Sequence, residues 1–510
     1  MAHLNDFKNN KLTRVVFIGF GILAMVCCFL AGGCKKSVTD EAMEQKIDTI
    51  KQALGQAYAN SASVPGYVEK IRETLLAFND KRCNALKEKE SALQLFEKGN
   101  LANAQTFFET IRKQDLDKHV SDPWSSCILG NIYYLQLKTD EAMTEYRAAE
   151  KLDPNNPDVQ YSIGLALLCA KEKNNEEILK YLEAALNGDT KKFGENSAKV
   201  SRDLKILAIG YKNMEQGLKS IESLERALMI DSKTSGDESP VTLSTLSELG
   251  SMWYAMGYYK KAVDSYEKVV TIKTKKKELE KPEISSDYNN LGSALGAGGD
   301  PKKALEYFIK AEASDLRHFG KGHPNVSRDW KNMANTYHML MNYQKSIEYY
   351  DQALNLDMRI KGAEHPEVGR DYLSLANVFG TVKDYKTAID YYGKALDIFT
   401  KNFGENHPST TMVYNNLGGL YLSLQNYEKA VEYYQKVLAY LVQTFGEEHE
   451  NTAPIYNFLG LALEGKGDVK GAIPNFEKAY KIFDRTLGAF HPNTKSAKAN
   501  LDKAKEKAGI

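Results

Sequence analysis

Histidine recurs at positions 323, 365, 407, 449 and 491, each 42 residues after the last. Histidines at such regular spacing could belong to a metal site, to a catalytic series or to a structural repeat. All ligands of one zinc ion lie about 2 Å from the metal, whereas packed helices lie about 8–10 Å apart. Histidines spread over successive repeats therefore cannot share one ion, and we predict that they are structural.

Other residues that could carry chemistry do not assemble into a recognisable active site. Residues 460–467 imitate a phosphate-binding loop, but Gly467 stands where that motif requires Ser or Thr. Residues 447–450 place His449 among glutamates without the second histidine, four residues away, of a zinc protease. The sequence also has no GxSxG motif. We therefore expect no enzymatic activity, no cofactor and no metal site.

The length and net charge of the chain limit the classes of function that we expect. At 510 residues the chain is too long for one compact core, so we expect several domains or a repeat array. The composition is that of a folded protein, with 43% hydrophobic and 26% charged residues and a formal net charge of zero. Nucleic-acid binding usually requires a basic excess or stripe. We expect no nucleic-acid partner and no small-molecule substrate.

Residues 1–33 are typical of an export signal. Basic residues precede an uncharged stretch at 15–33, which ends in small residues before Cys34. This resembles the lipobox of bacterial lipoproteins, although Ala31 stands where that motif prefers Leu. The resemblance implies that residues 1–33 are a lipoprotein signal peptide, and that the lipidated Cys34 anchors the mature chain in the bacterial cell envelope.

Two details bear on the location. The stretch at 15–33 approaches the length that spans a bilayer, so an uncleaved transmembrane anchor remains an alternative. Lys35 follows the cysteine, and the sorting rule of enteric bacteria then favours the outer membrane, facing the periplasm, in an organism with two membranes.

The histidine column is one of several with the same period. Proline follows most of the histidines, and glycine stands three residues before them. Within one period, the small residues Gly418 and Ala430 lie twelve positions apart, and large residues follow at Tyr421 and Tyr434. A fixed period of 20–50 residues is the mark of a solenoid. Glycine suits the end of one helix and proline the start of the next, and the intervening histidine can cap or pack on the junction.

This frame resembles the tetratricopeptide repeat (TPR), a helix–turn–helix unit. The resemblance implies an all-α fold, a right-handed superhelical solenoid of antiparallel helix pairs. We predict a tether and lead-in helices at 34–84, three repeats of about 34 residues at 85–190, seven 42-residue repeats at 191–492 and a capping helix at 493–510. The longer repeats look like those of kinesin light chain. Their eight extra residues, about two helical turns, are most simply placed at the end of the second helix.

In TPR proteins the first helix of each pair lines a concave binding surface. That resemblance implies a strip of candidate partner-binding residues: Asn290, Arg328, Asn332, Asn335, Arg370, Asn377 and Asn416. Asparagine amides suit the main chain of a peptide, and arginine forks suit carboxylates. The alternative is structural, because Arg328-Asp329 and Arg370-Asp371 recur as pairs that could form salt bridges between repeats.

We therefore expect a membrane-anchored scaffold or adaptor that holds proteins or extended peptides, as in assembly of a secretion, pilus or peptidoglycan complex. A self-associating structural module remains an alternative. Beyond Cys34, the expected mature chain has Cys83, Cys127 and Cys169. They cannot all pair with one another, and we expect them to be small buried residues on helices.

Overall fold

The structure of the chain is a computed structural model that describes residues 126–127, 129–130, 133–134, 138–170, 174–276 and 282–510. The predicted signal at 1–33, Cys34, the tether at 34–84 and the whole first short repeat, 85–118, lie outside these residues. The chain divides into two compact units, Met1–Tyr307 (unit 1) and Phe308–Ile510 (unit 2).

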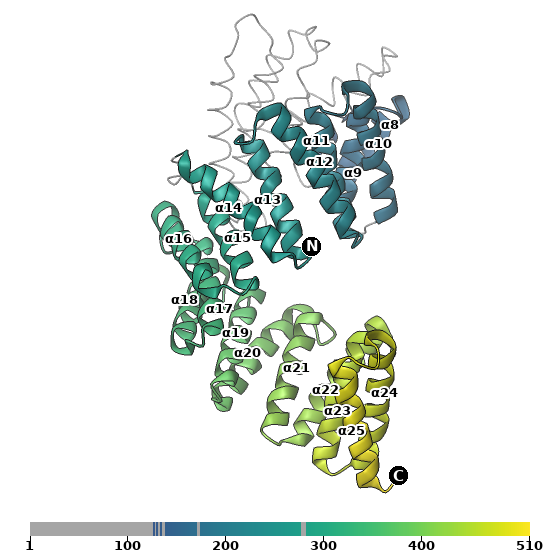
Figure 1. Cartoon of the computed structure of the whole chain (residues 1–510), viewed down its shortest axis with the longest axis vertical. Helices are drawn as coiled ribbons and strands as arrows, with labels where there is room; N and C mark the ends of the chain where they lie inside the picture. The colour runs from purple at the N-terminus through teal and green to yellow at the C-terminus, as the bar shows by residue number, and fades with distance from the viewer. Residues whose placement is uncertain (1–125, 128, 131–132, 135–137, 171–173, 277–281) are drawn as a thin grey trace, which may run out of the picture. The chain divides into compact units, whose positions relative to one another are not determined.

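The described residues form eighteen numbered α-helices and contain no strand (Figure 1). Those of unit 1 are α8 (Thr139–Leu152), α9 (Pro157–Cys169), α10 (Asn175–Phe193), α11 (Ala198–Asn213), α12 (Gly217–Ser235), α13 (Pro240–Ala255), α14 (Tyr259–Lys275) and α15 (Ile284–Ala297). The boundary between the units falls inside α16 (Pro301–Phe319). Those of unit 2 are α17 (Pro324–Met339), α18 (Tyr343–Lys361), α19 (Pro366–Thr381), α20 (Tyr385–Phe403), α21 (Pro408–Ser423), α22 (Tyr427–Phe445), α23 (Ala453–Lys466), α24 (Val469–Leu487) and α25 (Pro492–Ala508).

Within each unit, consecutive helices pack against each other as antiparallel pairs, a first helix (helix A) and a second (helix B). The column of small residues in helix A explains why the two helices of a pair can approach each other closely. A Cβ atom added at Gly460 of α23 would lie 2.6 Å from the ring of Phe476 on α24, and one at Gly418 of α21 would lie 3.0 Å from that of Tyr434 on α22. These glycines admit the large side chain of helix B, and the prediction of an all-α array of helix pairs is confirmed.

The eight extra residues of the long repeat are shared between both helices. Helix B grows from 14 residues in α8 to 19 in α18, and helix A grows from 13 in α9 to 16 in α17. The expectation that all eight extend helix B is therefore wrong, since three of them lengthen helix A. The predicted boundary at 190/191 falls inside α10, which runs to Phe193, and α25 begins at Pro492.

Each histidine of the column caps the helical segment that follows it, which for His449 is the short 3-10 helix Glu450–Thr452 ahead of α23. His365 Nδ1 accepts a hydrogen bond from the backbone N–H of Glu367 at 3.1 Å, and Pro366 is the first residue of α19. Equivalent hydrogen bonds are made by His323, His407, His449 and His491. In two earlier repeats, Ser197 and Ser239 occupy the same column and cap α11 and α13. Because serine is a common N-cap residue, the histidines perform a structural task that needs no metal.

The junction residues around the histidine also match their predicted roles. Gly362 ends α18 with a φ of +93°, a left-handed conformation that favours glycine. The histidine rings also pack, since His323 stacks on Phe319 and His407 on Phe403, each with ring centroids 4.3 Å apart. The turn between repeats is therefore built from glycine, histidine and proline together.

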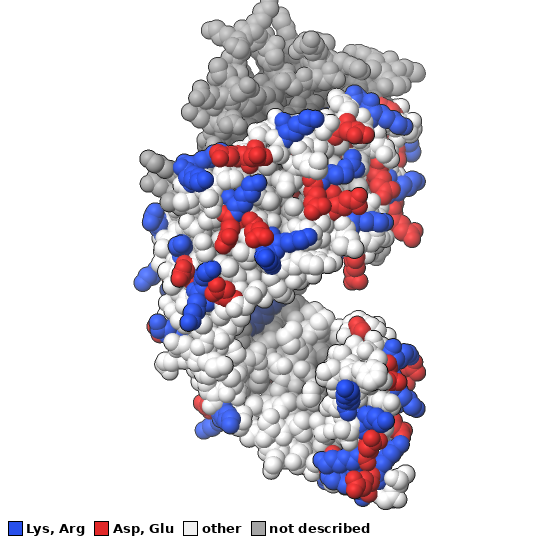
Figure 2. All heavy atoms as spheres, viewed as in Figure 1, with Lys and Arg blue, Asp and Glu red and all other residues white. Residues whose placement is uncertain are grey.

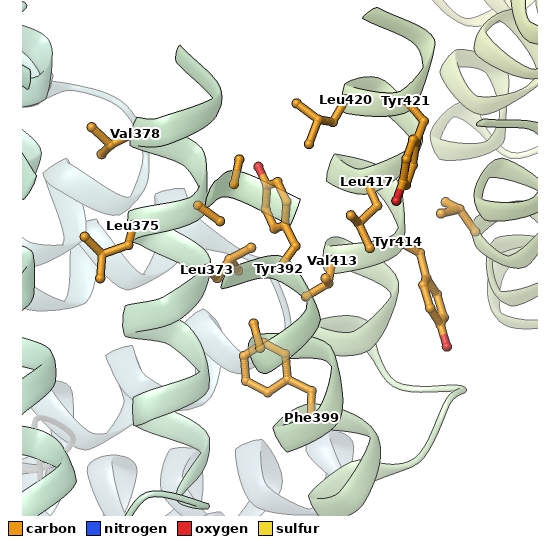
Figure 3. Close-up of a cluster of buried hydrophobic side chains, with 14 of the residues drawn as sticks. Leu373, Leu375, Val378, Tyr392, Phe399, Val413, Tyr414, Leu417, Leu420 and Tyr421 are labelled. Atoms are coloured by element: carbon orange, nitrogen blue, oxygen red, sulfur yellow. The ribbon is translucent and has the colours of Figure 1, made fainter. Parts of the chain in front are cut away.

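Buried side chains form a core between the helix pairs. Figure 3 shows part of this core in unit 2, where Leu375 and Val378 of α19, Phe399 of α20 and Val413 and Leu417 of α21 lie in one cluster. Cys127 is buried, and burial raises the pKa of its thiol to about 12. Cys169 is exposed at the end of α9, so the expectation that it is buried is wrong. Cys83 lies outside the described residues.

No helix in the described ranges has both the length and the apolar character needed to cross a membrane.

Candidate partner-binding surface

Four residues of α19 form the stripe that the core leaves uncovered. Arg370, Ser374, Asn377 and Thr381 follow each other at spacings of four, three and four, which places them on one face of a helix. The residues between them, such as Leu375 and Ala376, are buried. Two predicted site residues, Arg370 and Asn377, therefore lie on the outward face of this A helix.

The neighbouring A helices carry the same stripe. The residues that are not buried on the equivalent face are Arg328, Asn332, Asn335 and Met339 on α17, and Met412, Asn416, Gly419 and Ser423 on α21. Together with the α19 stripe they are called the A-face of unit 2. Two contacts link the helices that carry the stripes: His338 Nε2 of α17 lies 3.3 Å from Thr381 Oγ1, and Asn416 donates to Asn377 Oδ1 at 3.0 Å.

Six of the seven predicted residues thus lie on the A-face, and Asn290 lies elsewhere. Asn290 is half-buried on α15 of unit 1.

Two of the predicted asparagines also support the core. Tyr392 on α20 donates to Asn377 Oδ1 at 2.6 Å, and Tyr350 on α18 donates to Asn335 Oδ1. Burial raises the pKa of both tyrosines to about 12, so each phenol keeps its proton and remains a donor. Because the amide oxygen faces the tyrosine, the N–H₂ group of each asparagine is the part oriented for other partners.

The hydrogen bond between the asparagine and the tyrosine has a counterpart in the spacing of the sequence. Asn335, Asn377 and their tyrosines are separated by fifteen residues in both repeats, and Ser251 bonds to Tyr266 across the same spacing. A polar residue in the helix A column therefore accompanies a tyrosine in the helix B column in these three repeats.

The two arginines have different surroundings. Arg328 Nη2 lies 3.2 Å from Asp315 Oδ2 and 3.5 Å from Asp329 Oδ1, and both carboxylates are buried. Arg370 is 52% exposed and pairs with Glu367, one turn earlier on the same helix. Arg328 matches the structural alternative, in which the Arg-Asp pair bridges repeats. Arg370 remains available to a ligand from solvent.

The A-face loses charge towards the C-terminus. Helix α21 contains no Lys, Arg, Asp or Glu. Figure 2 shows that the side of unit 2 over α19–α21 is mostly free of charged side chains, whereas charges gather over the helices beyond it. Met412 on α21 is 53% exposed. The surface therefore offers an arginine and amides on α19 and an uncharged, partly apolar stretch on α21.

The glycines of the phosphate-loop imitation are used for packing. Besides Gly460 against Phe476, a Cβ atom at Gly465 would lie 2.3 Å from the ring of Tyr427. Among the described residues, no three His, Cys, Asp or Glu side chains are grouped so that they could hold a metal ion.

Family models match three parts of the chain. A model described as tetratricopeptide repeat matches residues 326–401, 372–441 and 409–485. A second model with that description matches residues 242–276, and a model described as TPR repeat matches residues 130–168. A comparison with curated proteins gives no match.

Several solved structures are similar to parts of the chain. BtubC (BKLC) from P. vanneervenii is 22% identical over 46% of this chain and 94% of that one, with a TM-score of 0.41. The TPR-like repeats of a putative kinesin light chain from Podosopora anserina are 20% identical over 41% and 98%, with a TM-score of 0.37. RapI in its apo form is 14% identical over 53% and 99%, with a TM-score of 0.35.

Proposed function

Because the chain carries tetratricopeptide repeats within residues 130–168, 242–276 and 326–485, we propose that it is a non-catalytic scaffold that binds protein or peptide partners on the A-face of unit 2. The observation that carries the proposal is the A-face itself. Its stripes on α17, α19 and α21 lie outside the core, and the three helices are linked by the His338–Thr381 and Asn377–Asn416 contacts.

The chemistry of the A-face suits an extended peptide. An asparagine amide can donate to a backbone carbonyl of the ligand, and the tyrosine contacts fix the amides of Asn335 and Asn377 with their oxygens inward. The exposed guanidinium of Arg370 can receive a carboxylate as a bidentate pair. The remaining predicted residues of unit 2, Arg328, Asn332 and Asn416, contribute to the same surface, whereas Asn290 is a separate candidate on unit 1.

We place this scaffold in the bacterial cell envelope, anchored to the membrane through a lipid on Cys34. The support is the sequence of residues 1–34, which resembles a lipoprotein signal. Metabolic labelling with a radioactive fatty acid tests this step. We expect label in the wild type and none in Cys34→Ser. Label that survives in Cys34→Ser would contradict lipidation at that residue, and an unprocessed chain would favour the uncleaved anchor.

Partner capture tests the function. In-cell crosslinking from the membrane fraction, read by mass spectrometry, compares the wild type with Arg370→Glu. The matched control is Arg359→Glu, which makes the same charge change at an exposed position of α18. We expect the partner to be lost in Arg370→Glu and kept in Arg359→Glu. Equal capture by both variants would remove Arg370 from the binding site.

Self-association is the alternative function. Size-exclusion chromatography with light scattering distinguishes it, because a scaffold for other proteins is expected to remain monomeric at all concentrations. A mass that rises with concentration, together with crosslinks only between copies of this chain, would favour the structural module.

A further inference from the structure

The junctions between successive repeats fall into two chemical classes. At the eight junctions from α10–α11 to α24–α25, a residue near the end of helix B is paired with the residue fourteen positions later on the next helix A, as Thr245 donates to Asp231 and Lys273 to Asp287. Five junctions have polar pairs: Asp189/Asp203, Asp231/Thr245, Lys273/Asp287, Asp315/Asp329 and Asp357/Asp371. The last three have apolar pairs: Phe399/Val413, Leu441/Ile455 and Phe483/Ala497.

The α18–α19 junction places two buried carboxyl groups together. Asp357 and Asp371 are both 0% exposed, and neither carboxylate oxygen of Asp371 accepts a hydrogen bond. Lys331 Nζ of α17 lies 2.8 Å from Asp357 Oδ2 and 3.3 Å from Asp371 Oδ1. Two buried carboxyl groups that share one ammonium group are accommodated most easily when one of them holds a proton.

The other groups around the pair do not provide Asp371 with a cation of its own. Lys361 of α18 lies 3.4 Å from Asp357 Oδ1, and His365, which caps α19, also interacts with Asp357 rather than with Asp371. Glu367 of α19 competes for Lys331 at 3.8 Å. The phenol of Tyr350, also on α18, faces Asp371 and keeps its proton. Helix α20 brings the apolar Ile398 and Phe399 against this end of α19, at Gly369.

The electrostatics agree with this geometry. Burial, reinforced by the Asp357 carboxylate and opposed by Lys331, raises the pKa of Asp371 to about 7. For Asp357, burial acts in the same direction, but Lys331 and Lys361 outweigh it and lower its pKa. Two like charges in one dry site cannot both form cheaply, so the pair titrates as a unit.

We propose that the α18–α19 junction is a proton-sensitive joint, in which Asp357 and Asp371 share one proton and whose helices separate more readily once that proton is lost. The apolar α20–α21 junction, with Phe399 against Val413 (Figure 3), lacks this sensitivity. The proposed pH sensitivity of this junction depends only on the fold. An effect of pH on a ligand bound at Arg370 and Asn377, two residues of α19, would also depend on the proposed function.

The direction of the effect follows from proton linkage. Asp371 exposed by local opening would titrate near its ordinary pKa of about 4, whereas in the closed junction its pKa is about 7. The closed state therefore binds more protons between these values, and its stability falls as the pH rises from about 4 to about 7 and then levels.

The α10–α11 junction of unit 1 repeats the arrangement. Arg202 lies 2.9 Å from Asp189 Oδ2 and 2.8 Å from Asp203 Oδ1, and both aspartates are buried. Burial, reinforced by Asp189 and opposed by Arg202, raises the pKa of Asp203 to about 7. Asp158, Lys199 and the phenol of Tyr161 also face this cluster.

Hydrogen exchange on the full chain tests the joint without any partner. Mass spectrometry at pH 5, 6, 7 and 8 gives protection factors, corrected for intrinsic exchange, for peptides across α18–α19 and across α20–α21. The second junction is the internal control. We expect protection at α18–α19 to fall relative to α20–α21 by up to about tenfold per pH unit between pH 5 and 7, as release of one proton requires.

Two variants test whether Asp371 causes the pH dependence of protection at the α18–α19 junction. Asp371→Asn removes the titrating group and should abolish the slope, whereas Glu367→Gln changes a neighbouring half-buried carboxylate and should keep it. A constant ratio in the wild type from pH 5 to 8, or a slope that survives in Asp371→Asn, would overturn the proposal. If Asp371→Asn does not fold, the wild-type series and Glu367→Gln still decide.

Discussion

At the scale of single residues, the A-face and the core share side chains. The oxygen of Asn377 accepts from both the Tyr392 hydroxyl and the Asn416 amide, so a residue predicted to hold a partner also completes a hydrogen bond of a buried ring. A binding defect in an Asn377 variant therefore needs a stability measurement beside it. Arg370, which makes only an exposed pair with Glu367, is the better probe of binding.

The Asn377–Tyr392 hydrogen bond predicts a measurable coupling. Asn377→Ala should destabilise the protein by about 1–2 kcal/mol, because it leaves a largely buried hydroxyl without its acceptor. In the double variant with Tyr392→Phe, the two losses should be less than additive by about 1 kcal/mol. Urea unfolding of the four proteins measures this cycle. Strict additivity would show that the contact contributes nothing.

The two arginines should differ in their effect on stability. Arg328→Ala removes a cation that contacts the buried carboxylates of Asp315 and Asp329, and should cost about 2–3 kcal/mol, less than for a fully buried pair because Arg328 is 35% exposed. Arg370→Ala removes a surface pair and should cost less than about 0.5 kcal/mol. Thermal unfolding compares them. Equal losses would contradict the different surroundings.

Residue roles were only partly predictable. The stripe of Arg370 and Asn377 follows from helical spacing, because a period of 3.6 residues places them on one face. The sequence left two roles open for Arg328, and its buried partner Asp315 lies thirteen residues away on another helix. That pairing depends on how helices pack, which local spacing does not define.

At the scale of helices, the junction turns are built from local chemistry. Glycine ends helix B, histidine caps helix A and proline begins it, and all three roles were predicted from the repeat. The division of the eight extra residues between both helices was not predicted, because helix ends depend on packing and capping as well as on the period of the repeat. The polar and apolar junction classes were also missed, since they appear only when columns fourteen residues apart are compared.

The capping role of histidine predicts which substitutions are tolerated. His365→Ser should keep stability within about 0.5 kcal/mol, since Ser197 and Ser239 cap the equivalent helices, whereas His365→Ala should cost about 1 kcal/mol. Burial, together with Lys361 and despite Asp357, lowers the pKa of His365, so the ring stays neutral and accepts at neutral pH. Thermal unfolding with metal analysis checks this. A metal ion lost in His365→Ala would contradict the structural role.

The turns inside the helix pairs offer a second test. Lys383 has a φ of +63°, and glycine occupies the same column at Gly257, Gly299 and Gly467. Lys383→Gly should therefore stabilise the protein by about 0.5–1 kcal/mol by removing left-handed strain. Lys386→Gly, inside α20, should destabilise it by a similar amount. Chemical unfolding that gives both variants the same sign would contradict this reading of the turn.

At the scale of the whole molecule, the repeats differ in the chemistry of the junctions that join them. The last three junctions of unit 2 are apolar, whereas the junctions before them depend on buried charge. The charge-dependent junctions include α18–α19, which supports Arg370 and Asn377, and the apolar ones support the uncharged stretch of α21. In such a scaffold the stability of the C-terminal repeats of unit 2 would not depend on pH, whereas the stability of the α18–α19 junction in the same unit would.

The central claim is that the A-face of unit 2 holds a protein partner. Its most direct test is photo-crosslinking in cells from a reactive residue placed at Met412, 53% exposed on α21, and at Glu432, exposed on the outer helix α22. Our account predicts a crosslink to another protein from position 412 that is absent from position 432. Equal crosslinking from both positions, or crosslinks only to other copies of this chain, would contradict it.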